Sequence, residues 1–290
     1  MRRKRLTLSV EATELRGLVA QGERIVSWAS RPLPGQVVAN GQIARPGEFG
    51  AVVRALVDKL EGPRKAVVSL SARGALVRVM DMPSVPSDMM EEAVRREARR
   101  ELPLPLEELY LSWQGIGEQS SGRTRVCLIG TPRQAVDNCV AGLREAGIRP
   151  VAIDLKPLAL LRAVNRPDVL LANLEEQAGG VVLARHFVPY VVRSTTFPGQ
   201  APGSPTDRAD GLIVEIRRTL DFYRSTLAEQ HPDWTPVACL TGEFGTGGRI
   251  RSQIESQWAL VEPQPPLTLP EALPLQKYLV NVGLVLKSLS

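Results

Sequence analysis

The 290-residue chain contains two separate stretches in which three short β-rich runs follow one another closely. Such spacing predicts an antiparallel meander in each stretch. Amphipathic helices and further strands follow each meander, so the pattern predicts an α/β protein built from two halves of the same architecture. No sequence period can be aligned between the halves, so the repeat is structural. The runs cover residues 6–10, 14–20 and 24–30 in the first stretch and 169–174, 180–184 and 187–195 in the second.

A proline-rich link divides the first half. Residues 83–86 (PSVP) are stiff and lie between a strand expected at 76–80 and a helix expected at 88–101. This helix carries opposite charges three and four residues apart and has only a thin apolar seam for packing. Other helices are expected at 46–60, 134–146, 158–164, 213–227, 250–258 and 275–289, and other strands at 66–70, 110–115, 125–129, 151–154 and 237–240.

The composition excludes several classes of protein. No apolar run reaches the roughly 18 to 20 residues that a membrane-spanning helix needs, since the best candidate, residues 278–286, contains Asn281 and Gly283. The apolar run after the basic N-terminus is too short for a secretory signal, so we expect the chain to stay in the cytoplasm. Three widely spaced cysteines and two histidines indicate neither a disulfide framework nor a zinc site.

Motifs of hydrolytic enzymes are not recognisable. Adjacent carboxylates such as Glu91 and Glu92 do not face each other on a helix, so we interpret them as solvated charge rather than an acid–base pair. Neither histidine lies in a nucleophile motif. The tryptophans are scattered and are not interleaved with basic strands, so we expect no nucleic-acid partner from them.

A basic cluster at residues 2–5 (RRKR) keeps one alternative open. The chain has a net charge of +5, and most of its basic residues alternate with acidic ones along the expected helices, as on a solvated face. The N-terminal cluster has no such neighbours. An adaptor for nucleic acid or an anionic membrane is therefore a possible function class, and its binding would depend steeply on salt concentration.

Three segments resemble one known family. They are residues 92–98 (EAVRREA) with 102–108 (LPLPLEE), residues 143–154 (LREAGIRPVAID), and residues 214–223 (VEIRRTLDFY). Together they are similar to the type IV pilus assembly protein PilM, an actin-like ATPase-fold relative of the cell-division protein FtsA. The resemblance implies an α/β actin-like ATPase fold, with ribonuclease H-like duplicated halves and an inserted small α/β subdomain.

The resemblance also implies a division of the chain. We expect a first actin-like subdomain over residues 1–82 and an inserted partner-binding subdomain over 83–154. A second actin-like half is expected over 155–270, followed at 271–290 by a terminal helix that returns to the first half.

The family's nucleotide motifs correspond to particular positions of this sequence. The first phosphate hairpin of the family typically carries Asp, then Gly and small hydroxyl residues, then Lys, and the second hairpin again carries Asp and Gly. A glycine turn contacts the adenosine side. The matching positions here are Ser9, Glu11, Ala12, Thr13 and Arg16 in the first hairpin, Asn173, Glu175 and Glu176 in the second, and Gly242 and Gly245 in the glycine turn.

These positions predict a degenerate nucleotide site. A phosphate cradle needs backbone N–H groups that approach closely, which favours Gly, and a carboxylate that holds magnesium through water. Ser9 and Asn173 replace the acidic positions, while Glu11 and Glu175 add negative charge. Like charges about 4 Å apart repel by about 4 kcal/mol at an effective dielectric of 20. We therefore expect no cofactor, metal site or catalytic residue, although Thr13 and Arg16 can still touch a phosphate.

The leading hypothesis from the resemblance is a cytoplasmic scaffold at the inner face of the cytoplasmic membrane. It would bind the cytoplasmic tail of a bitopic inner-membrane pilus assembly protein in the groove between the first two subdomains and link it to the pilus assembly motor components, with self-association as a further possibility. The alternative is an ATPase or kinase of the actin-like fold that binds ATP and magnesium.

Overall fold

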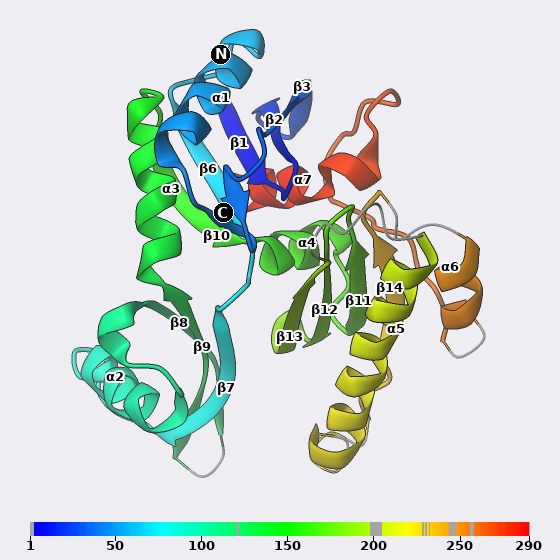
Figure 1. Ribbon diagram of the computed structural model, residues 1–290. Helices are drawn as coiled ribbons and strands as arrows, with labels where there is room; N and C mark the ends of the chain where they lie inside the picture. The colour runs from blue at the N-terminus through cyan, green and yellow to red at the C-terminus, as the bar shows by residue number, and fades with distance from the viewer. Residues whose placement is uncertain are drawn as a thin grey trace.

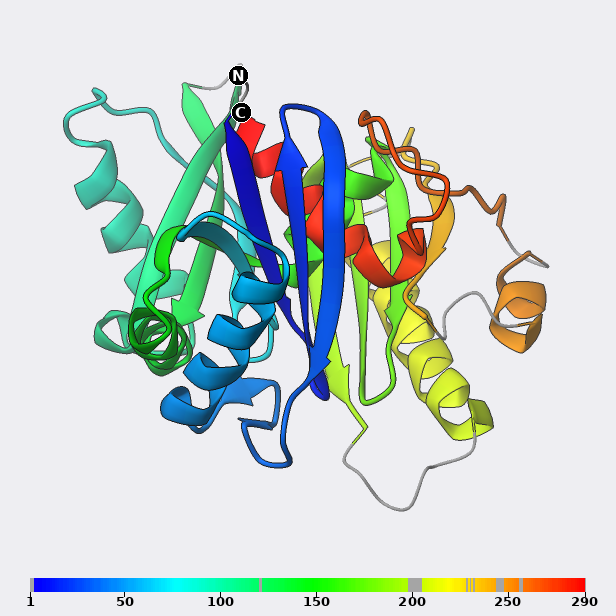
Figure 2. The same ribbon diagram turned by 90° about the horizontal axis from the view of Figure 1, so that it is seen from above.

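Two β-sheets face each other across a central pair of helices, and a third, smaller sheet projects from the first half (Figures 1 and 2). The computed structural model describes residues 3–119, 122–197, 205–227, 229, 231, 233–243, 248–255 and 258–289.

The first sheet contains an antiparallel meander and two parallel strands. Its strand order is β10-β6-β1-β2-β3, in which β1, β2 and β3 are antiparallel neighbours and β6 runs parallel to β1. Strand β10 extends the sheet by pairing in parallel with β6. The strands are β1 (Lys4–Val10), β2 (Glu14–Gln21), β3 (Arg24–Pro32), β6 (Lys65–Leu70) and β10 (Arg149–Leu155).

The second sheet repeats this topology. Its order is β13-β12-β11-β14, with an antiparallel meander from β11 to β13 and β14 parallel to β11. All six residues of β11 are buried, as expected for an apolar run in a central strand. The predicted duplication of the two halves is therefore confirmed. The strands are β11 (Val169–Leu174), β12 (Ala178–Arg185), β13 (Val188–Thr196) and β14 (Val237–Thr241).

Three pairs of helices pack against the two sheets, one pair on each outer face and one pair between them. Helices α1 and α3 share a hydrophobic core with the first sheet, and α5 and α6 share one with the second. Helices α4 and α7 fill the space between the sheets (Figure 2). The helices are α1 (Pro46–Lys59), α3 (Arg133–Glu145), α4 (Lys156–Val164), α5 (Pro205–Phe222), which continues as a π-helix over Tyr223–Leu227, α6 (Gly248–Glu255) and α7 (Leu275–Leu289).

Two residues that interrupt the apolar sequence of α7 have packing roles. The Asn281 side chain is fully buried, and its Nδ2 donates to the Thr7 carbonyl at 3.2 Å and to the Arg16 carbonyl at 3.2 Å, which ties α7 to β1 and β2. At Gly283 the helix lies directly against α4, because an added Cβ would be 1.8 Å from the Ala159 carbonyl oxygen. Within the described residues, no helix is long and apolar enough to cross a membrane.

The small sheet has its own hydrophobic core. Its order is β7-β9-β8, and α2 packs on one of its faces. The strand pairing does not follow the expected boundary between segments 1–82 and 83–154. Strand β7, expected in the first segment, belongs to the small sheet. Strand β10, expected at the end of the second segment, pairs with β6 in the first sheet. The elements are β7 (Leu76–Pro83), α2 (Met90–Glu101), a 3-10 turn (Leu106–Glu108), β8 (Leu109–Gln119) and β9 (Arg123–Pro132); a short hairpin of β4 (Val38–Ala39) and β5 (Gln42–Ile43) precedes α1.

The α4–α7 contact leads to a prediction for Gly283→Ala. Alanine is favoured over glycine in a helix by about 1 kcal/mol, but here its methyl group overlaps the Ala159 main chain and forces the two helices apart. We expect a net destabilisation of at least about 2 kcal/mol in urea unfolding. Gly248→Ala in α6 is the control, since no atom lies within 4 Å of its added Cβ, and it should be neutral or slightly stabilising. Equal stability of the two variants would contradict the packing described.

Candidate functional site

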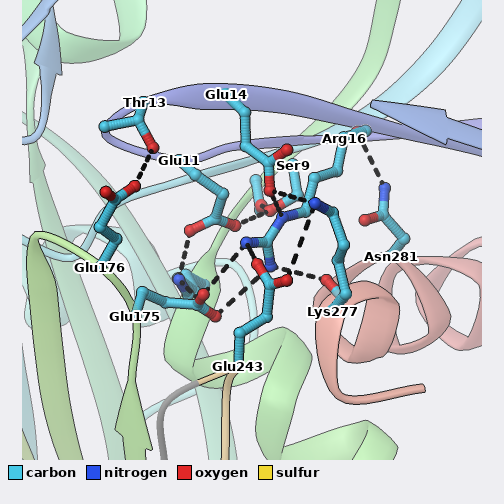
Figure 3. A network of polar contacts seen from close by, with 12 residues as sticks. Ser9, Glu11, Thr13, Glu14, Arg16, Glu175, Glu176, Glu243, Lys277 and Asn281 are labelled. Atoms are coloured by element: carbon cyan, nitrogen blue, oxygen red, sulfur yellow. Dashed lines mark hydrogen bonds and ion pairs between the residues drawn. The ribbon is translucent and has the colours of Figure 1, made fainter. Parts of the chain in front are cut away.

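The two predicted phosphate hairpins lie opposite each other at the boundary between the halves (Figure 3). The first is the turn between β1 and β2, and the second is the turn between β11 and β12. They are in direct contact, because the Thr13 hydroxyl donates to Glu176 Oε2 at 3.1 Å. The structure thus brings the residues predicted from the two motifs into one place.

The Arg16 guanidinium lies between the two hairpins, and 3% of its side chain is exposed. Burial alone would lower its pKa, but the carboxylates of Glu11 and Glu175 raise it, so the group stays charged. Each of its nitrogen atoms donates to an acceptor. The contacts are Nε to Glu14 Oε1 at 2.7 Å, Nη1 to the Lys277 carbonyl at 2.7 Å, and Nη2 to Glu175 Oε2 at 3.0 Å and Glu243 Oε2 at 2.6 Å.

A second buried cation, Lys156, lies between the two hairpin carboxylates. Its ammonium group donates to Glu11 Oε2 and lies 3.6 Å from Glu175 Oε1. Glu11 also accepts a hydrogen bond from the Ser9 hydroxyl at 2.5 Å. Lys156 opens α4, the helix between the sheets. The cation therefore joins a carboxylate of each half.

The pKa values of the two hairpin carboxylates are shifted in opposite directions. Burial would raise the pKa of Glu11, but Lys156 and Arg16 outweigh it and lower the pKa to about 2. Burial raises the pKa of Glu175, and the neighbouring charge of Glu11 adds to this effect. Ionised Glu11 thus stabilises the fold above the ordinary carboxyl pKa of 4.5, and this contribution is lost as the pH falls toward about 2.

Four residues of this ion cluster were not predicted from the sequence: Glu14, Lys156, Glu243 and Lys277. Lys277 of α7 pairs with Glu14 Oε1 at 3.0 Å, which adds a further cation to the cluster. Glu14 lies within the first predicted hairpin and Glu243 follows the predicted Gly242, whereas Lys156 and Lys277 come from α4 and α7 and nothing in their local sequence distinguishes them from solvated charges. We call the set Glu11, Glu14, Arg16, Lys156, Glu175, Glu243 and Lys277 the interhalf ion cluster.

The remaining predicted nucleotide residues have structural contacts. Asn173 Oδ1 accepts a hydrogen bond from the Thr241 hydroxyl at 3.0 Å, which joins the ends of β11 and β14. Gly242 has φ +89°, and an added Cβ there would be 2.2 Å from the Leu174 carbonyl oxygen, so this glycine is required by close packing. Gly245 lies outside the described residues.

A cavity of about 740 Å³ lies between the small sheet and the two halves. One wall is the face of the small sheet opposite α2, the second is the end of β10 with α4, and the third is the turn between β12 and β13. We call this cavity the groove. From β8 and β9 its lining includes three register pairs, Tyr110 with Thr131, Ser112 with Ile129, and Gln114 with Cys127.

Strand β8 is the edge of the small sheet on the groove side. Among the described strands it pairs only with β9, so its outer edge carries main-chain groups that a further strand can pair with. Tyr110 and Trp113 are 40% and 38% exposed. The Tyr110 hydroxyl donates to Asp137 at 3.0 Å and its ring lies under the Arg133 guanidinium, so the tyrosine is held in place.

The charged end of the groove is formed by three side chains. Asp154 is buried at the end of β10 and pairs with Arg162 of α4 at 2.6 Å and with Lys287 of α7 at 3.7 Å. Two cations thus surround one carboxylate. This end of the groove favours an acidic or uncharged group over a basic one.

Comparisons with known proteins agree with this architecture. The sequence model of the family described as type IV pilus assembly protein PilM matches residues 7–184, more than half of the chain. The solved structure of a PilM–PilN type IV pilus biogenesis complex is 24% identical, with a TM-score of 0.80 and 100% of both chains covered.

Two further solved structures are more distant. The ethanolamine utilization protein EutJ from Carboxydothermus hydrogenoformans is 12% identical, with a TM-score of 0.55 over 99% of this chain and 90% of that one. The cytoplasmic domain of EpsL, an inner membrane component of the type II secretion system of Vibrio cholerae, is 14% identical, with a TM-score of 0.55 over 99% and 95%. The chain has the actin-like ATPase fold, as predicted.

The ion cluster leads to a prediction for Lys156→Met. Removing a buried cation leaves the carboxylates of Glu11 and Glu175 without their shared partner, so we expect a loss of about 3 kcal/mol in urea unfolding. The double variant Lys156→Met/Glu11→Gln should regain part of this loss.

The matched control is Arg64→Met. Arg64 pairs with Asp58 at 2.8 Å, but both side chains are more than half exposed, so the change should stay within about 1 kcal/mol. A Lys156→Met variant as stable as the Arg64→Met variant would show that the buried pairs do not stabilise the contact between the halves.

Proposed function

The chain belongs to the type IV pilus assembly protein PilM family, and on this premise we propose that it is a scaffold of pilus assembly. Its proposed partner is the cytoplasmic tail of a bitopic inner-membrane assembly protein, bound in the groove as an extended segment. This places the chain at the inner face of the cytoplasmic membrane, between that protein and the assembly motor components.

The edge strand β8 is the observation that carries this proposal. An extended peptide that adds to a free sheet edge gains main-chain hydrogen bonds, and pockets beside the strand select its side chains. Residues 110–116 of β8 line the groove, which corresponds to about 20 Å of extended chain at about 3.3 Å per residue. The groove volume of about 740 Å³ is within the range of specific binding sites, about 300–1,000 Å³.

The related structures support a membrane-protein partner. The PilM structure was solved as a PilM–PilN complex, and EpsL is itself an inner-membrane component with a cytoplasmic domain of this fold. The fold thus occurs in a pilus biogenesis complex with a second protein and as the cytoplasmic domain of an inner-membrane component. For this chain we propose the same arrangement.

We further propose that the nucleotide site is degenerate. A triphosphate needs free cations and closely approaching N–H groups, whereas each nitrogen of Arg16 donates within the ion cluster and Lys156 is paired with Glu11 and Glu175. The residues present do not fit ATP and magnesium, so the alternative of an ATPase or kinase is not favoured. The two hairpins line a pocket of about 470 Å³, and Glu11 and Glu175 place negative charge beside any phosphate that enters it.

The proposed function predicts saturable binding of one peptide. The probe is a fluorescein-labelled synthetic peptide of the cytoplasmic tail of the single-span pilus assembly protein encoded beside this chain. Fluorescence anisotropy should give a Kd in the micromolar range. Ser112 lines the groove from β8, so the arginine of Ser112→Arg should block the peptide and raise the Kd at least tenfold. Ser112 is exposed, so the larger side chain should not disturb the fold.

Ser87→Arg is the matched control. Ser87 is an exposed serine of the same subdomain that precedes α2 and does not line the groove. Its Kd should stay within about twofold of the wild-type value. Absence of saturable binding, or equal weakening by both arginines, would overturn the proposal.

A further inference from the structure

The turn between β12 and β13 brings an aromatic side chain of the second half to the groove. Arg185 and Val188 are register partners, so His186 and Phe187 form a two-residue turn. Both residues line the groove together with Val188 and Pro189. The groove is therefore not confined to the first half and its small sheet.

The Phe187 side chain is largely exposed, which is unusual for a phenylalanine. It is 48% exposed, whereas the phenylalanine at the centre of the first-half core, Phe49, is fully buried. Within the described residues, Phe187 is not a member of any of the four hydrophobic clusters. A large apolar side chain that contributes to no core and lines a cavity is typical of a binding surface.

The turn holds Phe187 in a fixed position. His186 and Phe187 have φ values of +50° and +64°, as a two-residue hairpin turn of type I′ requires at both of its central residues. The His186 N–H donates to Asp168 Oδ1 at 3.1 Å, and the Phe187 N–H donates to the Pro167 carbonyl at 2.9 Å. The backbone that carries the ring is thus preorganised, which reduces the entropy lost when a partner packs against Phe187.

We infer that Phe187 is an anchor for the peptide that occupies the groove, so that the second half contributes directly to partner binding. This inference rests on the proposed function and adds to it a contact outside the first half. The occupant is an extended segment that pairs with β8 and places an apolar side chain against Phe187. Its binding would connect the small sheet, β10 and the second half.

The charges of the groove restrict the occupant further. Arg162 and Lys287 surround Asp154 at the end of the groove nearest α4 and α7. An apolar tail without a run of lysine or arginine residues complements this lining, and a polybasic segment does not. The charges thus disfavour a basic tail, and the exposed Phe187 ring selects an extended tail with an apolar residue.

The test compares Phe187 with a phenylalanine of similar exposure elsewhere. Phe222 at the end of α5 is 39% exposed and does not line the groove. With the tail peptide as the probe, Phe187→Ala and Phe187→Gly should each raise the Kd about tenfold, whereas Phe187→Tyr and Phe222→Ala should stay within twofold. Because glycine readily adopts a positive φ, a loss of affinity in the glycine variant cannot be attributed to backbone strain.

A photo-crosslink provides a second, direct readout. p-Benzoylphenylalanine at position 187 should crosslink to the tail peptide, and the same group at position 222 should not. If Ser112→Arg abolishes binding while Phe187→Ala and Phe187→Gly bind normally and no crosslink forms, the anchor is wrong and the proposed function stands. If wild-type protein does not bind the tail, both are wrong.

Discussion

The buried guanidinium of Arg16 is the contact on which the relation between the two halves depends. It comes from β2 of the first half and donates to Glu175 and Glu243, which follow strands of the second half. Lys156 makes a second such connection, between Glu11 of the first half and Glu175 of the second. Charges this deeply buried are costly unless each finds partners, so a change in the angle between the halves would leave several of them unpaired.

Such a cluster changes what the fold can be used for. Side chains of the chain itself connect the two halves, and in the proposed scaffold this connection takes the place of a nucleotide. The proposed scaffold predicts a fixed angle between the halves, which would also fix the walls of the groove, because the β12–β13 turn belongs to the second half while β8 and β10 belong to the first. A rigid groove suits a protein that holds a partner rather than one that opens and closes in a catalytic cycle.

The strands and helices could be predicted because their apolar spacing is local. The meanders and the helices α1, α3, α4 and α7 follow from that spacing, and Asn281 and Gly283 were already visible as interruptions of an apolar run. The pairing of β7 with β9, the position of β10 and the β4–β5 hairpin depend on contacts between distant segments. Lys156 and Glu243 could not be predicted for the same reason, since only the tertiary fold places them beside Glu11 and Arg16.

The most direct test of this account measures the distance between the halves with and without nucleotide. Spin labels at Val26→Cys in β3 and Val214→Cys in α5 occupy exposed positions of the two halves, while the native thiols of Cys127, Cys139 and Cys239 are buried, with pKa values that burial raises to about 11, 12 and 12. Double electron–electron resonance should give one narrow distance distribution that magnesium ATP at millimolar concentration does not change. A shift of several ångströms on addition of ATP would contradict the account.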